Sequence, residues 1–98
     1  MITWHIWFTL KPGKADEYLT HFAKLRTAIA ATDGIESGDV YRDTVHPDRF
    51  IAVMVFRDQA AADAYPQSAA REAFLAVARP LYASVDRHAI YEIGRAHV

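Results

Sequence analysis

The sequence predicts one α+β domain whose elements follow the order strand, helix, strand, strand, helix, strand. Three observations support this prediction. Strand-type alternation occurs near both ends of the chain and again in its middle, helical periodicity fills the stretches between, and 98 residues fit one domain. We therefore expect residues 1–98 to form a single domain.

The first predicted strand, residues 2–11, alternates between two faces. The apolar face is expected to pack in the core and consists of Ile2, Trp4, Ile6, Phe8 and Leu10. His5 and Trp7 lie in the middle of the opposite face, so that face is unlike an ordinary solvent-exposed surface.

The first predicted helix begins at Ala15, after a turn that contains Pro12 and Gly13, and ends before Gly34. Its apolar stripe follows the i, i+3, i+4 rule and consists of Tyr18, Leu19, Phe22, Leu25 and Ile29. Gly34 can adopt the left-handed conformation that commonly ends a helix.

The second and third predicted strands cover residues 35–44 and 50–56. In the second strand, Gly38 indicates a bulge or an edge position, because glycine weakens the interior of a strand. The third strand is apolar on both alternating sets, so both of its faces need cover.

The remaining elements are two helices and a last strand. Asp58 is a suitable N-cap for a short helix that runs to Ala64, and Ser68 for a longer one. Pro80 is expected to end the longer helix, and the last strand is predicted over residues 87–93.

This order predicts a ferredoxin-like arrangement and a homodimer. Right-handed crossovers place four antiparallel strands in one sheet with the helices on one face. The other face lacks cover, although it carries His5, Trp7, Ile51, Val53 and Val55. A second copy of the sheet would cover it, so we expect pairing through this face. The alternative is that these are scattered surface residues.

The composition excludes several classes of protein. The net charge is −1 with no Lys/Arg cluster, which argues against a nucleic-acid partner. There is no cysteine, and the five histidines lack metal-ligand spacing, so we expect no metal. No apolar run approaches the roughly 20 residues that span a bilayer, and we find no signal peptide. We therefore expect no membrane partner and a cytoplasmic location.

Several segments together resemble a known family. They are Thr9-Leu10-Lys11-Pro12-Gly13-Lys14 before a helix, Asp33-Gly34 before a strand, Phe50–Phe56 followed by Arg57-Asp58-Gln59-Ala60-Ala61, and a later Gln67-Ser68. Through these segments the chain resembles the antibiotic biosynthesis monooxygenase family of the dimeric α/β-barrel superfamily. The resemblance implies a pocket between sheet and helices, and oxidation of aromatic phenols to quinones without metal, flavin or other cofactor.

The resemblance also implies site residues. A small aromatic ligand would contact Trp4, Ile6, Ala52, Met54, Phe56 and Phe74, with Tyr65 covering the mouth of the pocket. Tyr65 and His21 are the expected catalytic residues. The strand alternation, in contrast, predicts that His5 and His88 meet on the far face of the sheet, in the dimer interface. The alternative for the strand residues is an ordinary apolar core.

The chain departs from the family pattern at several positions. It contains no Asn, and the family's frequent Asn and Trp of the third strand fall on Ala52 and Phe56. The histidine that ligates haem in haem-degrading members falls near Leu75, so haem degradation is not expected.

Three functions remain open at this point. The first is a cofactor-independent oxygenase, and the second is a cyclase or isomerase of the same superfamily. The third is a non-catalytic ligand-binding or stress-response module. An enzyme should show an enclosed cavity with a titratable group, and a module should show a filled core.

Overall fold

The structure is a computed structural model that describes residues 1–94. Its elements are β1 (Ile2–Leu10), α1 (Ala15–Ala30), β2 (Ile35–Arg42), β3 (Arg49–Phe56), α2 (Gln59–Ala64), η1 (Tyr65–Gln67), α3 (Ala69–Ala78), η2 (Arg79–Leu81) and β4 (Tyr82–Glu92), where η marks a 3₁₀ turn. This order confirms the predicted α+β, ferredoxin-like arrangement.

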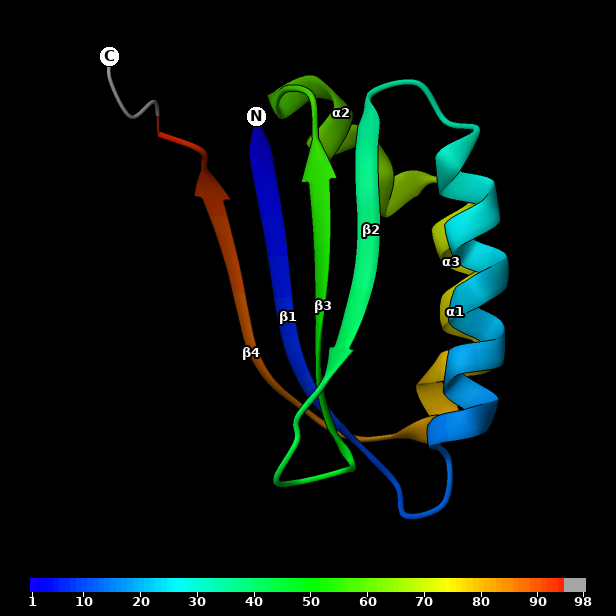
Figure 1. Ribbon diagram of the computed structural model, residues 1–98. Helices are drawn as coiled ribbons and strands as arrows, with labels where there is room; N and C mark the ends of the chain where they lie inside the picture. The colour runs from blue at the N-terminus through cyan, green and yellow to red at the C-terminus, as the bar shows by residue number, and fades with distance from the viewer. Residues whose placement is uncertain (95–98) are drawn as a thin grey trace.

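The four strands form one antiparallel sheet in the order β2-β3-β1-β4, and the helices cover one side of it (Figure 1). Trp4 of β1 pairs with Met54 of β3 and with Ile90 of β4. Paired residues point to the same side of a sheet, so this row faces the helices and the adjacent row, through His5, faces away. We call the uncovered side the bare face.

The core lies between the sheet and the helices, with Tyr18 of α1 at its centre. The Tyr18 ring contacts Phe8, Phe50 and Phe74 at centroid distances of 5.0, 6.1 and 5.6 Å. Burying side chains of this size contributes roughly 1.5–3 kcal/mol each. The helical stripe predicted from periodicity is therefore the side of α1 that packs on the sheet.

The predicted N-caps of α2 and α3 are confirmed, whereas α1 ends at Ala30 with Ala31 as its C-cap, and Gly34 (φ +90°) lies three residues later in the turn before β2. The Asp58 carboxylate accepts a hydrogen bond from the Ala61 N–H at 2.9 Å, and the Ser68 hydroxyl accepts one from the Arg71 N–H at 3.2 Å. α3 ends at Ala78, directly before the 3₁₀ turn that contains Pro80. Each cap supplies an acceptor for an N–H group that has no partner within the helix.

Gly38 lies in β2, an edge strand with a bulge near its start, as a glycine inside a strand suggests. A Cβ atom at this position would overlap the Ile29 side chain and come within 2.8 Å of the Met54 sulfur. The glycine therefore allows α1 and β3 to pack closely against β2.

Two predicted strand boundaries were wrong by more than one residue. β2 ends at Arg42 rather than residue 44, because the Asp43 carboxylate accepts hydrogen bonds from the Val45 and His46 N–H groups and starts a turn. β4 begins at Tyr82 rather than residue 87. Register shifts in its pairing with β1 interrupt the alternation of this strand. The first half of β4 therefore lacks the regular pattern from which a strand is predicted.

None of the helices in the described part of the chain is long and apolar enough to cross a membrane.

Candidate functional site

Three aromatic residues predicted for the site meet on the helix side of the sheet. Trp4 lies near the start of β1, Phe56 ends β3 and Tyr65 begins η1. Their ring centroids are 5.4 Å apart for Trp4 and Phe56, 5.6 Å for Trp4 and Tyr65, and 5.5 Å for Phe56 and Tyr65. We call this group the aromatic cluster. Its rings meet at steep angles, an arrangement that aromatic pairs favour.

The other residues predicted to contact a ligand lie around this cluster. Ile6 and Ala52 pair across β1 and β3 and are half-buried, whereas Met54 is buried beside Trp4. Phe74 of α3 is buried against Tyr18. These positions form one apolar layer between sheet and helices.

His21, the second residue predicted to be catalytic, lies on α1 outside the aromatic cluster. Its Nε2 atom is 3.9 Å from the Glu17 carboxylate one turn earlier, and its side chain is partly exposed. Aromatic contacts join Trp4 to Phe56, Tyr65 and His88, and His21 is not part of this group.

The Trp4 indole Nε1–H is buried and has no hydrogen-bond acceptor in the described part of the chain. A buried donor without a partner costs roughly 1–3 kcal/mol, and most such groups in proteins are satisfied. A ligand oxygen at this position would satisfy the Trp4 donor. Sequence reasoning identified Trp4 as apolar lining and did not foresee its free N–H.

Tyr65 and Tyr82 add two hydroxyl groups near the Arg71 guanidinium. Burial raises the pKa of Tyr65 to about 12, although Arg71 acts in the opposite direction. Burial also raises the pKa of Tyr82, against the opposing effects of the Tyr18 hydroxyl and of Arg71. Both side chains are therefore protonated at neutral pH and can act as hydrogen-bond donors. The Arg71 guanidinium carbon lies 5.9 Å from the centre of the Tyr65 ring.

The expected meeting of His5 and His88 on the far face was wrong. His88 pairs with Ile6, faces the helix side and contacts the Trp4 ring at a centroid distance of 5.7 Å. His5 faces the other way and stacks on Trp7 at 5.8 Å. His88 is solvent-exposed, so the aromatic cluster has one histidine at its open edge.

Little empty space lies next to the aromatic cluster. A cavity of about 100 Å³ that Tyr65 lines lies between the end of α1, the start of β2 and the connection from α2 to α3. This volume is far below the roughly 300–1,000 Å³ of ordinary ligand pockets. An aromatic ligand can therefore enter only if side chains of the cluster move.

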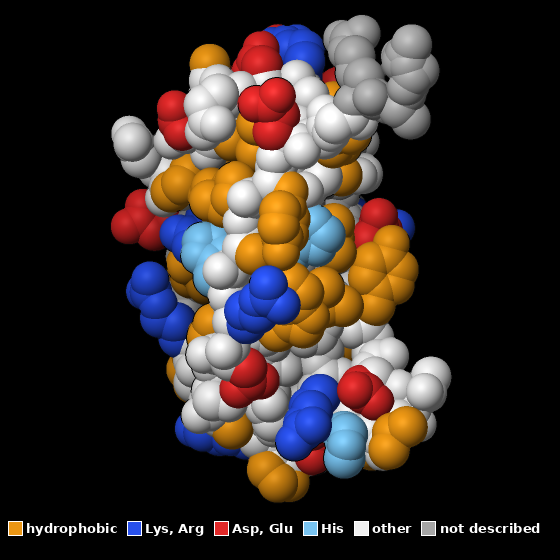
Figure 2. All heavy atoms as spheres, turned by 90° about the vertical axis from the view of Figure 1, so that its left-hand side faces the viewer, with side chains coloured by type: hydrophobic (Ala, Val, Ile, Leu, Met, Phe, Trp, Pro, Cys, Tyr) orange, Lys and Arg blue, Asp and Glu red, His pale blue; other side chains and the backbone are white. Residues whose placement is uncertain are grey.

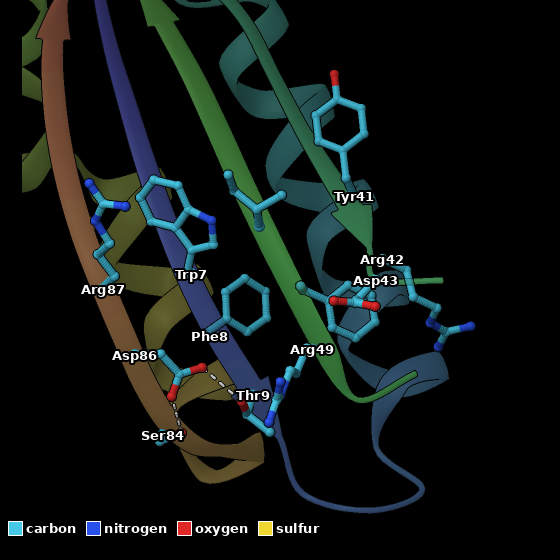
Figure 3. Close-up of a pocket in the computed structure, with 12 residues that line it drawn as sticks. Trp7, Phe8, Thr9, Tyr41, Arg42, Asp43, Arg49, Ser84, Asp86 and Arg87 are labelled. Atoms are coloured by element: carbon cyan, nitrogen blue, oxygen red, sulfur yellow. Dashed lines mark hydrogen bonds between the residues drawn. The ribbon is translucent and has the colours of Figure 1, made fainter. Parts of the chain in front are cut away.

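A larger cavity, of about 770 Å³, opens on the bare face (Figure 3). We call it the sheet-face cavity. Its lining comes from all four strands and comprises Trp7, Phe8, Thr9, Tyr41, Arg42, Asp43, Arg49, Phe50, Ile51, Ser84, Asp86 and Arg87. Sequence reasoning assigned Trp7 and Ile51 to this face but missed the cavity, because Ser84 and Asp86 of β4 precede the predicted start of that strand at residue 87.

Within residues 1–94, no three His, Asp or Glu side chains converge in an arrangement that could hold a metal ion.

Comparisons with known proteins give one family. The family described as antibiotic biosynthesis monooxygenase matches residues 1–77. No curated protein sequence matches the chain.

Solved structures share the fold at low sequence identity. SnoaB, a cofactor-independent oxygenase from Streptomyces nogalater whose structure is that of a mutant, is 19% identical. It has a TM-score of 0.82 over 97% of this chain and 94% of its own. A candidate antibiotic biosynthesis monooxygenase from Chloroflexus aurantiacus is 20% identical, with a TM-score of 0.83 over 99% and 96%. One from Nitrosomonas europaea is 15% identical, with a TM-score of 0.85 over 99% and 100%.

Proposed function

This chain belongs to the antibiotic biosynthesis monooxygenase family, and on that premise we propose that it oxidises a small phenolic aromatic with O₂, without a bound cofactor. The substrate site is the apolar layer around the aromatic cluster, lined by Trp4, Ile6, Ala52, Met54, Phe56 and Phe74. The observation that carries the proposal is the buried Trp4 N–H without an acceptor, on an indole whose ring contacts the ring of Tyr65.

The proposed reaction converts a phenol to a para-quinone. The ring carbon opposite the hydroxyl loses its C–H bond and gains one oxygen atom of O₂ as a carbonyl. The other oxygen atom leaves as water, with the former C–H and O–H hydrogens. The substrate supplies all four electrons that reduce O₂, so the reaction needs no external reductant.

The protein would assist by holding the ring in a dry layer and by stabilising charge on its oxygen. The Trp4 N–H and the Tyr65 O–H are donors toward a phenolate, and such hydrogen bonds strengthen as negative charge develops. We propose His88 as the proton acceptor, because its ring contacts Trp4 at the open edge of the layer. His21, one turn from the Glu17 carboxylate, is the competing candidate.

Substrate entry would require Tyr65 to move. The three rings of the cluster contact each other, and the adjacent cavity of about 100 Å³ is too small for a ligand. Tyr65 is the cluster residue that lies in a short 3₁₀ turn rather than in the sheet. We therefore propose that Tyr65 swings outward to admit the substrate.

The test is oxygen uptake with a panel of hydroxynaphthalenes, with heat-denatured protein as the background. Trp4→Phe keeps an aromatic ring but lacks the N–H, and Tyr65→Phe lacks only the hydroxyl. We expect each to lower kcat/KM at least about tenfold, since a hydrogen bond to a charged group contributes about 1.5–3 kcal/mol. Uptake equal to the background in the folded wild type would contradict the oxygenase proposal.

Histidine variants separate the two candidate bases. We expect His88→Ala to lower kcat and to remove the limb of the pH profile that reports the base. His46→Ala is the matched control, because His46 lies in the exposed turn between β2 and β3. Loss of activity in His21→Ala but not in His88→Ala would assign the role to His21. Full activity in both variants would remove His21 and His88 from the mechanism.

The filled aromatic cluster also favours a second candidate function, a non-catalytic ligand-binding module. Such a module, or a cyclase or isomerase with the same layer, would bind hydroxynaphthalenes without consuming O₂. Isothermal titration beside the oxygen electrode distinguishes these cases. Binding without uptake supports the module or the isomerase, and turnover to an isomeric product supports the latter.

We also propose that the chain acts as a homodimer paired through the bare face. Figure 2 shows hydrophobic side chains and histidines gathered along the middle of the side away from the helices. His5, Trp7, Ile51, Val53 and Val55 are each half-buried in the single chain. A patch of this kind supports burial against a second copy.

A further inference from the structure

The sheet-face cavity lies on the opposite side of the sheet from the aromatic cluster. Its volume of about 770 Å³ falls within the range of small-molecule pockets. The chain has two tryptophans, and neighbouring β1 positions point to opposite faces, so Trp4 belongs to the cluster and Trp7 to the cavity. The cavity is thus a separate site from the one proposed for oxidation.

The floor of the sheet-face cavity is apolar and aromatic. Trp7 of β1 pairs with Ile51 of β3, and both side chains are half-buried. Tyr41 of β2 pairs with Ile51 from the other side. A flat ring placed over Trp7 and Ile51 would bury apolar surface on both.

The carboxylates in the cavity wall are satisfied within the protein. Asp86 accepts hydrogen bonds from the Thr9 and Ser84 hydroxyls at 2.8 and 2.5 Å, which Figure 3 shows as dashed lines. These bonds lower the pKa of Asp86, and the Arg49 guanidinium adds to the effect. The pKa of Asp43 is lowered by the backbone hydrogen bonds of its own turn, again with a contribution from Arg49.

Arg87, in contrast, has no anionic partner. Its guanidinium lies 4.6 Å from the centre of the Trp7 ring, beside it in Figure 3, and donates to the Tyr91 hydroxyl at 3.2 Å. Within residues 1–94 no carboxylate lies within 4.0 Å of its nitrogen atoms. An arginine beside an aromatic surface is suited to a planar carboxylate, which it can bind with two parallel hydrogen bonds.

We propose that the sheet-face cavity binds a planar aromatic carboxylate. The ring of the ligand lies over Trp7 and Ile51, and its carboxylate is hydrogen-bonded to Arg87. Trp7 and Ile51 also belong to the face proposed for pairing, so the ligand would lie at the edge of that interface and contact the second copy as well. This site does not depend on the oxygenase activity.

The test uses 4-nitrobenzoate, with the neutral 4-nitrobenzamide as the matched ligand, and both quench tryptophan emission. In Trp4→Phe protein the remaining reporter is Trp7, and in Trp7→Phe protein it is Trp4. We expect 4-nitrobenzoate to quench Trp7 with a Kd at least about tenfold below that of the amide. Quenching confined to the Trp4 reporter, or equal affinity for the two ligands, would overturn the proposal.

Arg87 variants test the anion contact directly in the Trp4→Phe background. We expect Arg87→Gln to weaken 4-nitrobenzoate binding at least about tenfold, and Arg87→Lys to recover part of the loss. Arg79→Gln removes the same charge from the exposed η2 turn and should leave the Kd unchanged. Unchanged binding by Arg87→Gln, or dissociation of the dimer by 4-nitrobenzoate, would also overturn the proposal. The comparison of the two ligands needs no Arg87 variant and decides the question if Arg87→Gln fails to fold.

Discussion

The Trp4 indole meets the Tyr65 ring edge-on, with the ring centroids 5.6 Å apart and the planes inclined by 71°. This contact closes the apolar layer on the helix side, and Tyr65 is 7% exposed. Opening the layer would expose the Tyr65 ring and free the Trp4 edge for a ligand. The energetics of Tyr65 are therefore central to the proposed site.

The stability of the fold should depend on pH through Tyr65. Its pKa is about 12 in the folded protein and about 10 in an unfolded chain. Below pH 10 the Tyr65 hydroxyl keeps its proton in both the folded and the unfolded chain, so the burial of Tyr65 contributes fully to the free energy of unfolding. Between pH 10 and 12 the unfolded chain loses the proton first, and the free energy of unfolding falls by roughly 3 kcal/mol.

Urea unfolding of wild type and Tyr65→Phe at pH 9 and pH 11.5 measures this effect. The variant should lose less stability than the wild type over this interval, because it lacks one titrating hydroxyl. Part of the decline should persist, since burial also raises the pKa of Tyr18, with the Tyr82 hydroxyl adding to the effect. Identical pH dependence in the two proteins would show that Tyr65 is not buried as described.

Phe56→Ala should strongly destabilise the domain. Phe56 is 0% exposed and packs against both Trp4 and Tyr65, so the substitution leaves a cavity in the aromatic cluster. We expect a loss of about 3–5 kcal/mol in the free energy of unfolding, measured by urea denaturation. Val45→Ala, at a position 75% exposed, is the control and should change stability by less than about 0.5 kcal/mol. A loss below about 1 kcal/mol in Phe56→Ala would argue against a tightly packed cluster.

Gly38→Ala should also be destabilising, although the added group is one methyl. The new Cβ would overlap the Ile29 side chain and crowd the Met54 sulfur, so α1 or β3 must shift. We expect a cost of about 1–3 kcal/mol, because overpacking forces side chains out of preferred rotamers. Gly94→Ala, where no atom of the described residues beyond the chain neighbours lies within 4 Å of the added group, should be neutral; thermal melting of the two variants measures the difference. Equal melting temperatures for the two variants would contradict the described packing of β2.

Val53→Arg should separate the proposed dimer. Val53 pairs with His5 on the bare face, and a charge buried between two sheets without a partner is costly. In analytical ultracentrifugation we expect the wild type at twice the chain mass of 11.0 kDa and the variant at the chain mass. Val45→Arg introduces the same charge in the exposed turn and should remain dimeric. A wild type at the chain mass would refute pairing through this face.

The features that local sequence patterns determine were predictable. The alternation of residues 2–11, the helical stripe from Tyr18 to Ile29 and the caps at Asp58 and Ser68 each depend on neighbouring residues. Each of these predictions is confirmed, and together they are enough to predict the order of strands and helices along the chain. The placement of Trp4 and Phe56 on the helix side also followed from the alternation and the family resemblance, whereas the resemblance implied a pocket where their rings and that of Tyr65 are in contact.

The features that depend on register between distant strands were not predictable. Asp86 is skipped in the pairing of β1 with β4, so the first half of β4 does not follow the alternation of its second half. This irregularity brings Asp86 to Thr9 and completes the sheet-face cavity. Likewise, the side on which His88 lies depends on its pairing with Ile6, across more than 80 residues of chain.

The most direct test of the proposed oxygenation is isotopic. Wild-type protein would be incubated with a hydroxynaphthalene under ¹⁸O₂, and the product would be analysed by mass spectrometry. Oxidation as proposed gives a naphthoquinone with one ¹⁸O atom, formed at one equivalent per O₂ consumed, and Trp4→Phe forms it at least about tenfold more slowly. Product without ¹⁸O, or formation no faster than with heat-denatured protein, would contradict the proposal.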